Sequence, residues 1–318
     1  MRLDDVVVVT VRKSFWASAD AEMFSNRVYA RLLYGHSTNL VNSLFVFLHG
    51  IMAIAVRRPR LVVLGSVERT VPWFIRARRA GLLGRAKLVV TNQLHLSSEQ
   101  LRQVERNIVY SRTWIESQPP EVRERAVFVP LPADGDFEAA QRRAVPSRSV
   151  FTGGGAGRDF AAVIEALDET SIPLEIVTFS RATLGWDGHL PANVRVQWRM
   201  PVQSFLEHIA SSLLVVVPLL DPASAFGQTT VVQALSLGKA VVATRTPGVV
   251  DYVQHGRQGF LVEANDVTGY REAILRLATD HQLRGSFERN ARESARRLTY
   301  PAFGGRLREI CATADVRQ

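Results

Sequence analysis

Residues 224–233 have the composition of a phosphate-binding segment. They read SAFGQTTVVQ and follow the apolar run LLVVVPLL at 213–220, which is the pattern of a strand, a loop and the start of a helix. The first amides of a helix have no partner inside the helix, and the helix dipole makes this end positive. Gly227 lets the backbone approach a ligand closely. Further donors come from Gln228, Thr229 and Thr230. The segment therefore predicts an uncharged cradle for a diphosphate, and a well-capped core helix is the alternative.

The rest of the sequence alternates between strand-like and helical runs, and these elements must position the segment at 224–233. Short apolar runs such as VVVVT (6–10), LVVLGS (61–66) and SVFTGG (149–154) are separated by stretches of helical spacing. This alternation predicts parallel sheets with helices on both faces.

The length of 318 residues is too great for one ordinary core. The polar segment ADGDFEAAQRRAVPS, at 133–147, reads as a connection, after which the pattern restarts. We therefore expect an α/β protein with two facing doubly wound, Rossmann-like domains and the active site in the cleft between them. The expected ranges are 1–140 for the first domain, 148–300 for the second, and 301–318 for a C-terminal helix that packs back toward the first.

The charge balance restricts the partners. A net charge of +9 calls for an anion such as a phosphorylated small molecule, a nucleic acid or an anionic membrane face, unless it is merely a solvated surface of an arginine-rich composition. Zinc-finger spacing, an RNP-like strand and a clear helix-turn-helix are absent, so we expect no nucleic acid. The one cysteine, Cys311, cannot form an internal disulfide, and the start MRLDDVVVVT lacks the basic region of a signal peptide. We expect a cytoplasmic protein.

An apolar stretch at 40–56, followed by RRPR, needs a separate interpretation. It contains Asn42, Ser43, His49 and Gly50, and it falls short of the roughly 20 apolar residues that a spanning helix needs. The pattern favours a buried helix that leads into the strand at 61–66, and contact with an anionic membrane face is the alternative.

Several motifs after Gly227 resemble the C-terminal half of GT-B glycosyltransferases. QALSLGKAVVAT, PGVVDYV and GRQGFLVEAND follow the order and spacing of the large retaining family that uses nucleotide sugars, the group 1 or family 4-like enzymes. SVFTGGGAGRDFAAVIEAL and AVFVPLPADGDF resemble earlier segments of that family more weakly. The resemblance implies a GT-B fold and transfer of a sugar from a nucleoside diphosphate to a hydroxyl acceptor with retention. It implies no cofactor other than the nucleotide-sugar co-substrate, and no metal.

The resemblance also implies roles for single residues. Gln233 stands where the family has the glutamate that binds the ribose, and Arg158 matches a diphosphate-binding lysine. Ala225 replaces a second glutamate, for which Asp221 is a candidate substitute. The expected donor-site residues are Arg158, Ser224, Phe226, Gly227, Gln228, Thr229, Thr230 and Gln233. The expected catalytic residues are His95 and Asp221, and the acceptor-side residues are Arg12, Lys13, Trp16, Asn92 and Gln93.

Three alternatives stay open at this point. Asp134-Gly135-Asp136 has the form of a metal-binding D-x-D motif, but its position after a strand favours a turn. GGGAGR at 153–158, with Arg181 on a 2′-phosphate, would suit an NADP-dependent oxidoreductase, although the third fingerprint glycine is replaced by arginine. The missing glutamate at Ala225 would also suit a non-catalytic domain that binds a nucleotide or a partner protein.

Overall fold

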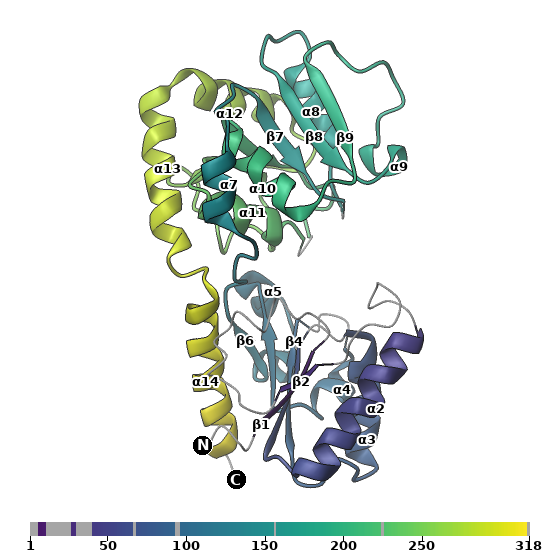
Figure 1. Cartoon of the computed structure of the whole chain (residues 1–318). Coiled ribbons are helices and arrows are strands. Elements are labelled where there is room, and N and C mark those ends of the chain that lie inside the picture. Colours follow the sequence, from purple (N-terminus) through teal and green to yellow (C-terminus); the bar gives the residue numbers. More distant parts are fainter. Residues whose placement is uncertain are drawn as a thin grey trace. The chain divides into compact units, whose positions relative to one another are not determined.

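A computed structural model describes residues 6–10, 27–29, 40–65, 68–92, 96–155, 157–223 and 226–316 (Figure 1). The chain divides into two compact units. The first consists of Met1–Pro130 together with Tyr300–Gln318, and the second of Leu131–Thr299.

The first unit has a parallel sheet of six strands in the order β2-β1-β3-β4-β5-β6. Its strands are β1 (Val6–Thr10), β2 (Arg27–Tyr29), β3 (Leu61–Gly65), β4 (Lys87–Thr91), β5 (Arg106–Val109) and β6 (Ala126–Phe128). Its helices are α2 (Leu40–Arg57), η2 (Glu68–Thr70), α3 (Val71–Arg79), α4 (Ser98–Leu101), α5 (Arg112–Glu116), α6 (Pro120–Arg123) and α14 (Tyr300–Val316). β3 is buried along its whole length, which explains its continuous apolar run LVVLG.

The second unit repeats this architecture with the strand order β12-β11-β10-β7-β8-β9, again with parallel pairs. Its strands are β7 (Val150–Gly153), β8 (Leu174–Thr178), β9 (Val194–Trp198), β10 (Leu214–Val217), β11 (Val241–Thr244) and β12 (Gly259–Val262). Its helices are α7 (Phe137–Arg143), α8 (Phe160–Leu167), α9 (Arg181–Leu184), α10 (Val202–Ser211), α11 (Gln228–Ser236), α12 (Val267–Thr279) and α13 (His281–Ala295). The central strands alternate between two apolar layers, with Phe151 in one and Val150 in the other. The prediction of two parallel α/β halves is confirmed.

The polar segment at 133–147 is part of the second unit. It forms α7, which packs against α10 within that unit. α14 belongs to the first unit, where Phe303 lies 6.4 Å from the ring of Tyr110.

The helix expected at 40–56 is α2, and only one of its faces is buried. Val46 and Ile54 lie in the core, whereas Leu48 and Met52 are more than half exposed. The sequence pattern did not reveal this division because both faces are apolar. Among the described residues, no helix is long and apolar enough to cross a membrane.

Candidate functional site

The start of α11 has the geometry of an open helix end. Gly227 is the residue before the helix, and its φ of 96° lies in the region that favours glycine. A Cβ at Gly227 would lie 3.1 Å from Leu219 Cδ1, so the position is also crowded. Because glycine has no side chain, no side-chain cap satisfies the first turn of α11. The helix therefore presents its first amides without a competing protein oxygen from its cap residue.

A glycine-rich loop lies next to this helix start. β7 ends at Gly153, and Gly154 and Gly157 have φ values of 121° and 61°. The loop is joined to the segment that follows β10: the amide of Leu220 donates to Gly157 O at 3.0 Å, and the amide of Asp159 donates to Pro218 O at 3.2 Å. Since β7 and β10 are neighbouring parallel strands, the two segments meet at the carboxyl edge of the sheet, where open α/β sheets bind ligands.

Arg158 links the glycine loop to α11. Its Nε donates to Gly153 O at 3.1 Å, and its Nη2 donates to Thr230 Oγ1 at 3.0 Å. The side chain is 9% exposed, and its burial lowers the pKa to about 10 from the usual 12.5. A cation in this position is poorly solvated, so an anion bound nearby would restore part of the lost stabilisation. The sequence singled out Arg158, but not its contact with Thr230.

A second buried network supports the loop after β10. Thr244, the last residue of β11, accepts a hydrogen bond from the amide of Leu219 at 2.5 Å, and its hydroxyl lies 2.6 Å from Tyr270 OH. Burial raises the pKa of Tyr270. Sequence reasoning missed both residues, because a threonine at a strand end and a tyrosine inside a helix carry no signal of a shared contact.

Gln233 lies on the same helix as Thr230 and faces the start of the second unit. It is 5% exposed, and its Nε2 donates to Asp134 O at 3.3 Å. A glutamate could not make this donation, so the amide anchors the chain that leads into α7. Its role toward a ribose stays a prediction.

The other predicted donor-side residues are more exposed. Phe226 is 54% exposed, and a Cβ at Gly157 would lie 3.4 Å from its ring. Gln228 is partly buried and Thr229 is exposed, both in the first turn of α11. Asp221 is exposed, and its Oδ1 accepts a hydrogen bond from the amide of Ala223 at 2.8 Å. Ser224 and Ala225 lie outside the described residues.

The first unit shows little of the predicted acceptor side. Asn92 follows β4 with a φ of 51°, and its backbone N–H donates to Ile108 O at 2.6 Å. The remaining acceptor-side and catalytic candidates lie outside the described residues: Arg12, Lys13, Trp16, Gln93 and His95.

The Asp134-Gly135-Asp136 motif stands at the start of a helix. Asp136 Oδ1 accepts a hydrogen bond from the amide of Ala139 at 2.9 Å and so caps α7. Gly135 has a φ of 138°, and a Cβ there would overlap the side chain of Leu206. Over the described ranges, no group of three or more His, Cys, Asp or Glu side chains is arranged to hold a metal ion.

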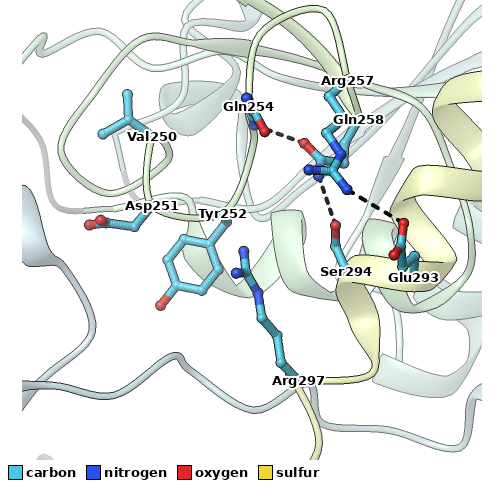
Figure 2. A pocket seen from close by; sticks show the side chains of 9 residues that line it. All are labelled: Val250, Asp251, Tyr252, Gln254, Arg257, Gln258, Glu293, Ser294 and Arg297. Atoms are coloured by element: carbon cyan, nitrogen blue, oxygen red, sulfur yellow. Dashed lines mark hydrogen bonds and ion pairs between the residues drawn. The ribbon is translucent and has the colours of Figure 1, made fainter.

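A separate cavity of about 470 Å³ lies between the segment 250–258 and α13 (Figure 2). Several of its polar groups bind one another. Arg257 pairs with Glu293 at 3.5 Å, and Gln258 Nε2 donates to Ser294 Oγ at 2.8 Å. None of the predicted site residues lines it. The glycine loop with the start of α11 is therefore the better candidate for an anion site.

Residues 186–294 match the family of glycosyl transferases group 1. The match covers 109 of the 318 residues, all of them in the second unit. An 85-residue segment is 33% identical to N-acetyl-alpha-D-glucosaminyl L-malate synthase of Bacillus anthracis. That match covers 27% of this chain and 21% of the enzyme, or about a fifth of its length.

Solved glycosyltransferase structures share the fold of the whole chain. Alr3699/HepE of Anabaena, crystallised in complex with UDP, aligns with a TM-score of 0.69 over 97% of this chain and 99% of its own, at 15% identity. Sucrose-phosphate synthase of Thermosynechococcus elongatus aligns with a TM-score of 0.66 over 90% of this chain and 82% of its own, at 14% identity. The chain thus has the GT-B fold.

Proposed function

We propose that this chain is a glycosyltransferase that moves a sugar from a nucleoside diphosphate to a hydroxyl acceptor, with retention and without a metal ion. The observation that carries the proposal is the buried Arg158 guanidinium, which connects the glycine loop to the first turn of α11. A bare nucleoside would gain nothing from a poorly solvated cation, whereas a diphosphate would.

Transfer of a glycosyl group leaves negative charge on the departing diphosphate. In the proposed site, Arg158, the loop amides and the open start of α11 stabilise this charge, and the rigid strand ends fix its position. Arg158 already joins the loop to α11, and Thr244 holds the segment after β10, so these contacts are in place before a ligand binds. Such preorganised charge stabilisation supplies a large share of enzymatic rate enhancement.

The proposed roles of the other residues follow the family resemblance. Gln233 would bind the ribose diol through its amide oxygen, while its nitrogen stays on Asp134 O. Asp221 would contact the sugar, and His95 would act in catalysis. The acceptor is proposed to be a glycan, a lipid-linked sugar or a small molecule, and the place of action the cytoplasm.

UDP and UDP-glucose are the first ligands to test, because Alr3699/HepE was crystallised with each of them. The full chain would be incubated with a panel of nucleotide sugars, and free nucleoside diphosphate would be measured by mass spectrometry with and without a mixture of acceptors. Release from one donor supports the transferase. Absence of release from every donor that binds would favour a second candidate, a non-catalytic GT-B protein that binds a nucleotide. The replacement of the family glutamate by Ala225 is the observation behind this candidate.

A further inference from the structure

The solvent-facing side of α2 is an apolar row. Leu44, Leu48, Met52 and Val56 are 49%, 54%, 57% and 78% exposed. A spacing of four residues places them on one face of the helix, in a row about 18 Å long. Large apolar side chains that are exposed singly are common, but a continuous row of four on one helix marks a contact surface. We call these four residues the α2 row.

The opposite face of α2 is firmly packed, so the row is held in place. Phe47 lies 5.1 Å from the ring of Phe74 and 5.7 Å from that of Trp73, both of which belong to α3. Val46 and Ile54 are buried in the core of the first unit. The helix therefore cannot turn the row inward without losing this packing.

The segment from α2 to the end of β4 is rich in basic residues, of which Arg78 and Arg79 pair with Glu105 and Glu99. Between Leu40 and Asn92 the sequence has nine Arg and Lys residues and one carboxylate, Glu68. Arg57, Arg58 and Arg60 are exposed directly after Val56, where the α2 row ends. A surface that is both apolar and cationic complements the acyl boundary and the headgroups of an anionic bilayer.

We propose that α2 lies in the plane of an anionic membrane, with the α2 row among the outer acyl chains and the arginines on the headgroups. The row is a continuous apolar strip on one helix, which the outer acyl chains can surround while the arginines at its end remain at the headgroups. At 18 residues, α2 is suited to lying in the interface. This inference does not rest on the proposed glycosyl transfer, since membrane binding is measured without a donor.

Flotation of the full-length protein with phosphatidylcholine vesicles, with and without phosphatidylglycerol, tests the proposal. We expect binding to anionic vesicles at low salt, weaker binding at about 150 mM salt, and none to neutral vesicles. Leu48→Ser with Met52→Ser should lower the vesicle affinity at least tenfold. Arg57→Gln with Arg58→Gln and Arg60→Gln should lower it by up to about 100-fold at low salt, at roughly fivefold for each basic residue near the surface.

The matched control is Arg195→Gln with Arg289→Gln and Arg296→Gln, which removes the same charge from exposed positions of the second unit. It should bind like the wild type. An equal loss in the control would mean that net charge alone drives binding and would overturn the assignment to α2. Unchanged binding after the Leu48 and Met52 changes would overturn it as well.

A fluorescent probe gives a second reading in variants that keep Leu48 and the three arginines. With Cys311 replaced by serine, a cysteine at Met52 would be labelled with an environment-sensitive dye, and a cysteine at Arg289 would serve as the reference. Anionic vesicles should shift the emission at 52 to the blue and leave that at 289 unchanged. Equal shifts, no shift, or a vesicle-independent shift caused by self-association would refute the docking of α2 on lipid.

Discussion

Replacing Arg158 by alanine should separate diphosphate binding from nucleoside binding. The guanidinium lies between Gly153 O and Thr230 Oγ1, at the meeting point of the glycine loop and α11. Removing it deletes a cation next to the proposed diphosphate position. The ribose and the base are proposed to bind through other groups. The variant should therefore bind a nucleoside diphosphate more weakly and the bare nucleoside as before.

The size of the effect follows from the hydrogen bond that the guanidinium can make to the diphosphate. A hydrogen bond to a charged group contributes about 1.5–3 kcal/mol, which corresponds to a loss of roughly 10- to 150-fold in affinity. Burial lowers the Arg158 pKa to about 10 from 12.5, and this shift corresponds to about 3 kcal/mol that disfavours the charged form. The hydrogen bond to a charged group therefore sets the expected loss at up to about 3 kcal/mol, and the poor solvation of the buried cation gives its direction.

Calorimetric titration of UDP and uridine into wild type, Arg158→Ala and Arg158→Lys measures the difference. Arg158→Lys keeps the charge but not the two-sided hydrogen bonding, so it should lose less UDP affinity than alanine. Arg289→Ala, an exposed arginine of α13, is the matched control and should bind UDP normally. Equal losses for UDP and uridine in a folded Arg158→Ala protein would show that Arg158 is structural and would refute the reasoning.

Three further changes test neighbouring parts of the account. In urea unfolding, the wild type should have a larger free energy of unfolding than Tyr270→Phe at pH 8. This difference should shrink by about 1 kcal/mol between pH 8 and pH 10.5. The raised pKa keeps the folded phenol neutral while the unfolded one ionises near 10, so the wild type loses stability as the pH rises. Asp134→Ala with Asp136→Ala should cost about 1 kcal/mol of stability, because the cap of α7 is lost, and should leave the UDP affinity measured by calorimetry unchanged. Donor turnover should persist in excess chelator, and a metal requirement would contradict this. Gly227→Ala should cost about 1–2 kcal/mol in unfolding experiments and weaken UDP binding, because alanine disfavours a φ of 96° and would displace the start of α11. Unaltered UDP affinity would argue against this helix end as the phosphate-binding segment.

The fold could be predicted from the sequence because its local and global signals agree. Runs such as LVVLG are buried along their whole length, and only parallel sheets covered on both faces bury strands in this way. The sequence also singled out Gly227 as a residue that lets the backbone approach a ligand, but its φ of 96° was not part of that prediction.

The contacts between distant segments could not be predicted. Arg158 and Thr230 are 72 residues apart, and Gln233 and Asp134 are 99 apart, so no local pattern reports that they meet. The two faces of α2 look alike in the sequence, because both are apolar and burial on one side is decided by α3. Asp136 was read as part of a turn, and its capping of α7 needed the position of the Ala139 amide.

Hydrogen exchange followed by mass spectrometry tests the location of the nucleotide site most directly. The full chain would be compared with and without UDP, GDP and ADP, each at saturating concentration. We predict that at least one nucleotide slows exchange in the peptides that cover 153–160 and 219–233, where the glycine loop and the start of α11 meet. Protection confined to the cavity at 250–258 and α13, or to the first unit, would contradict the central claim.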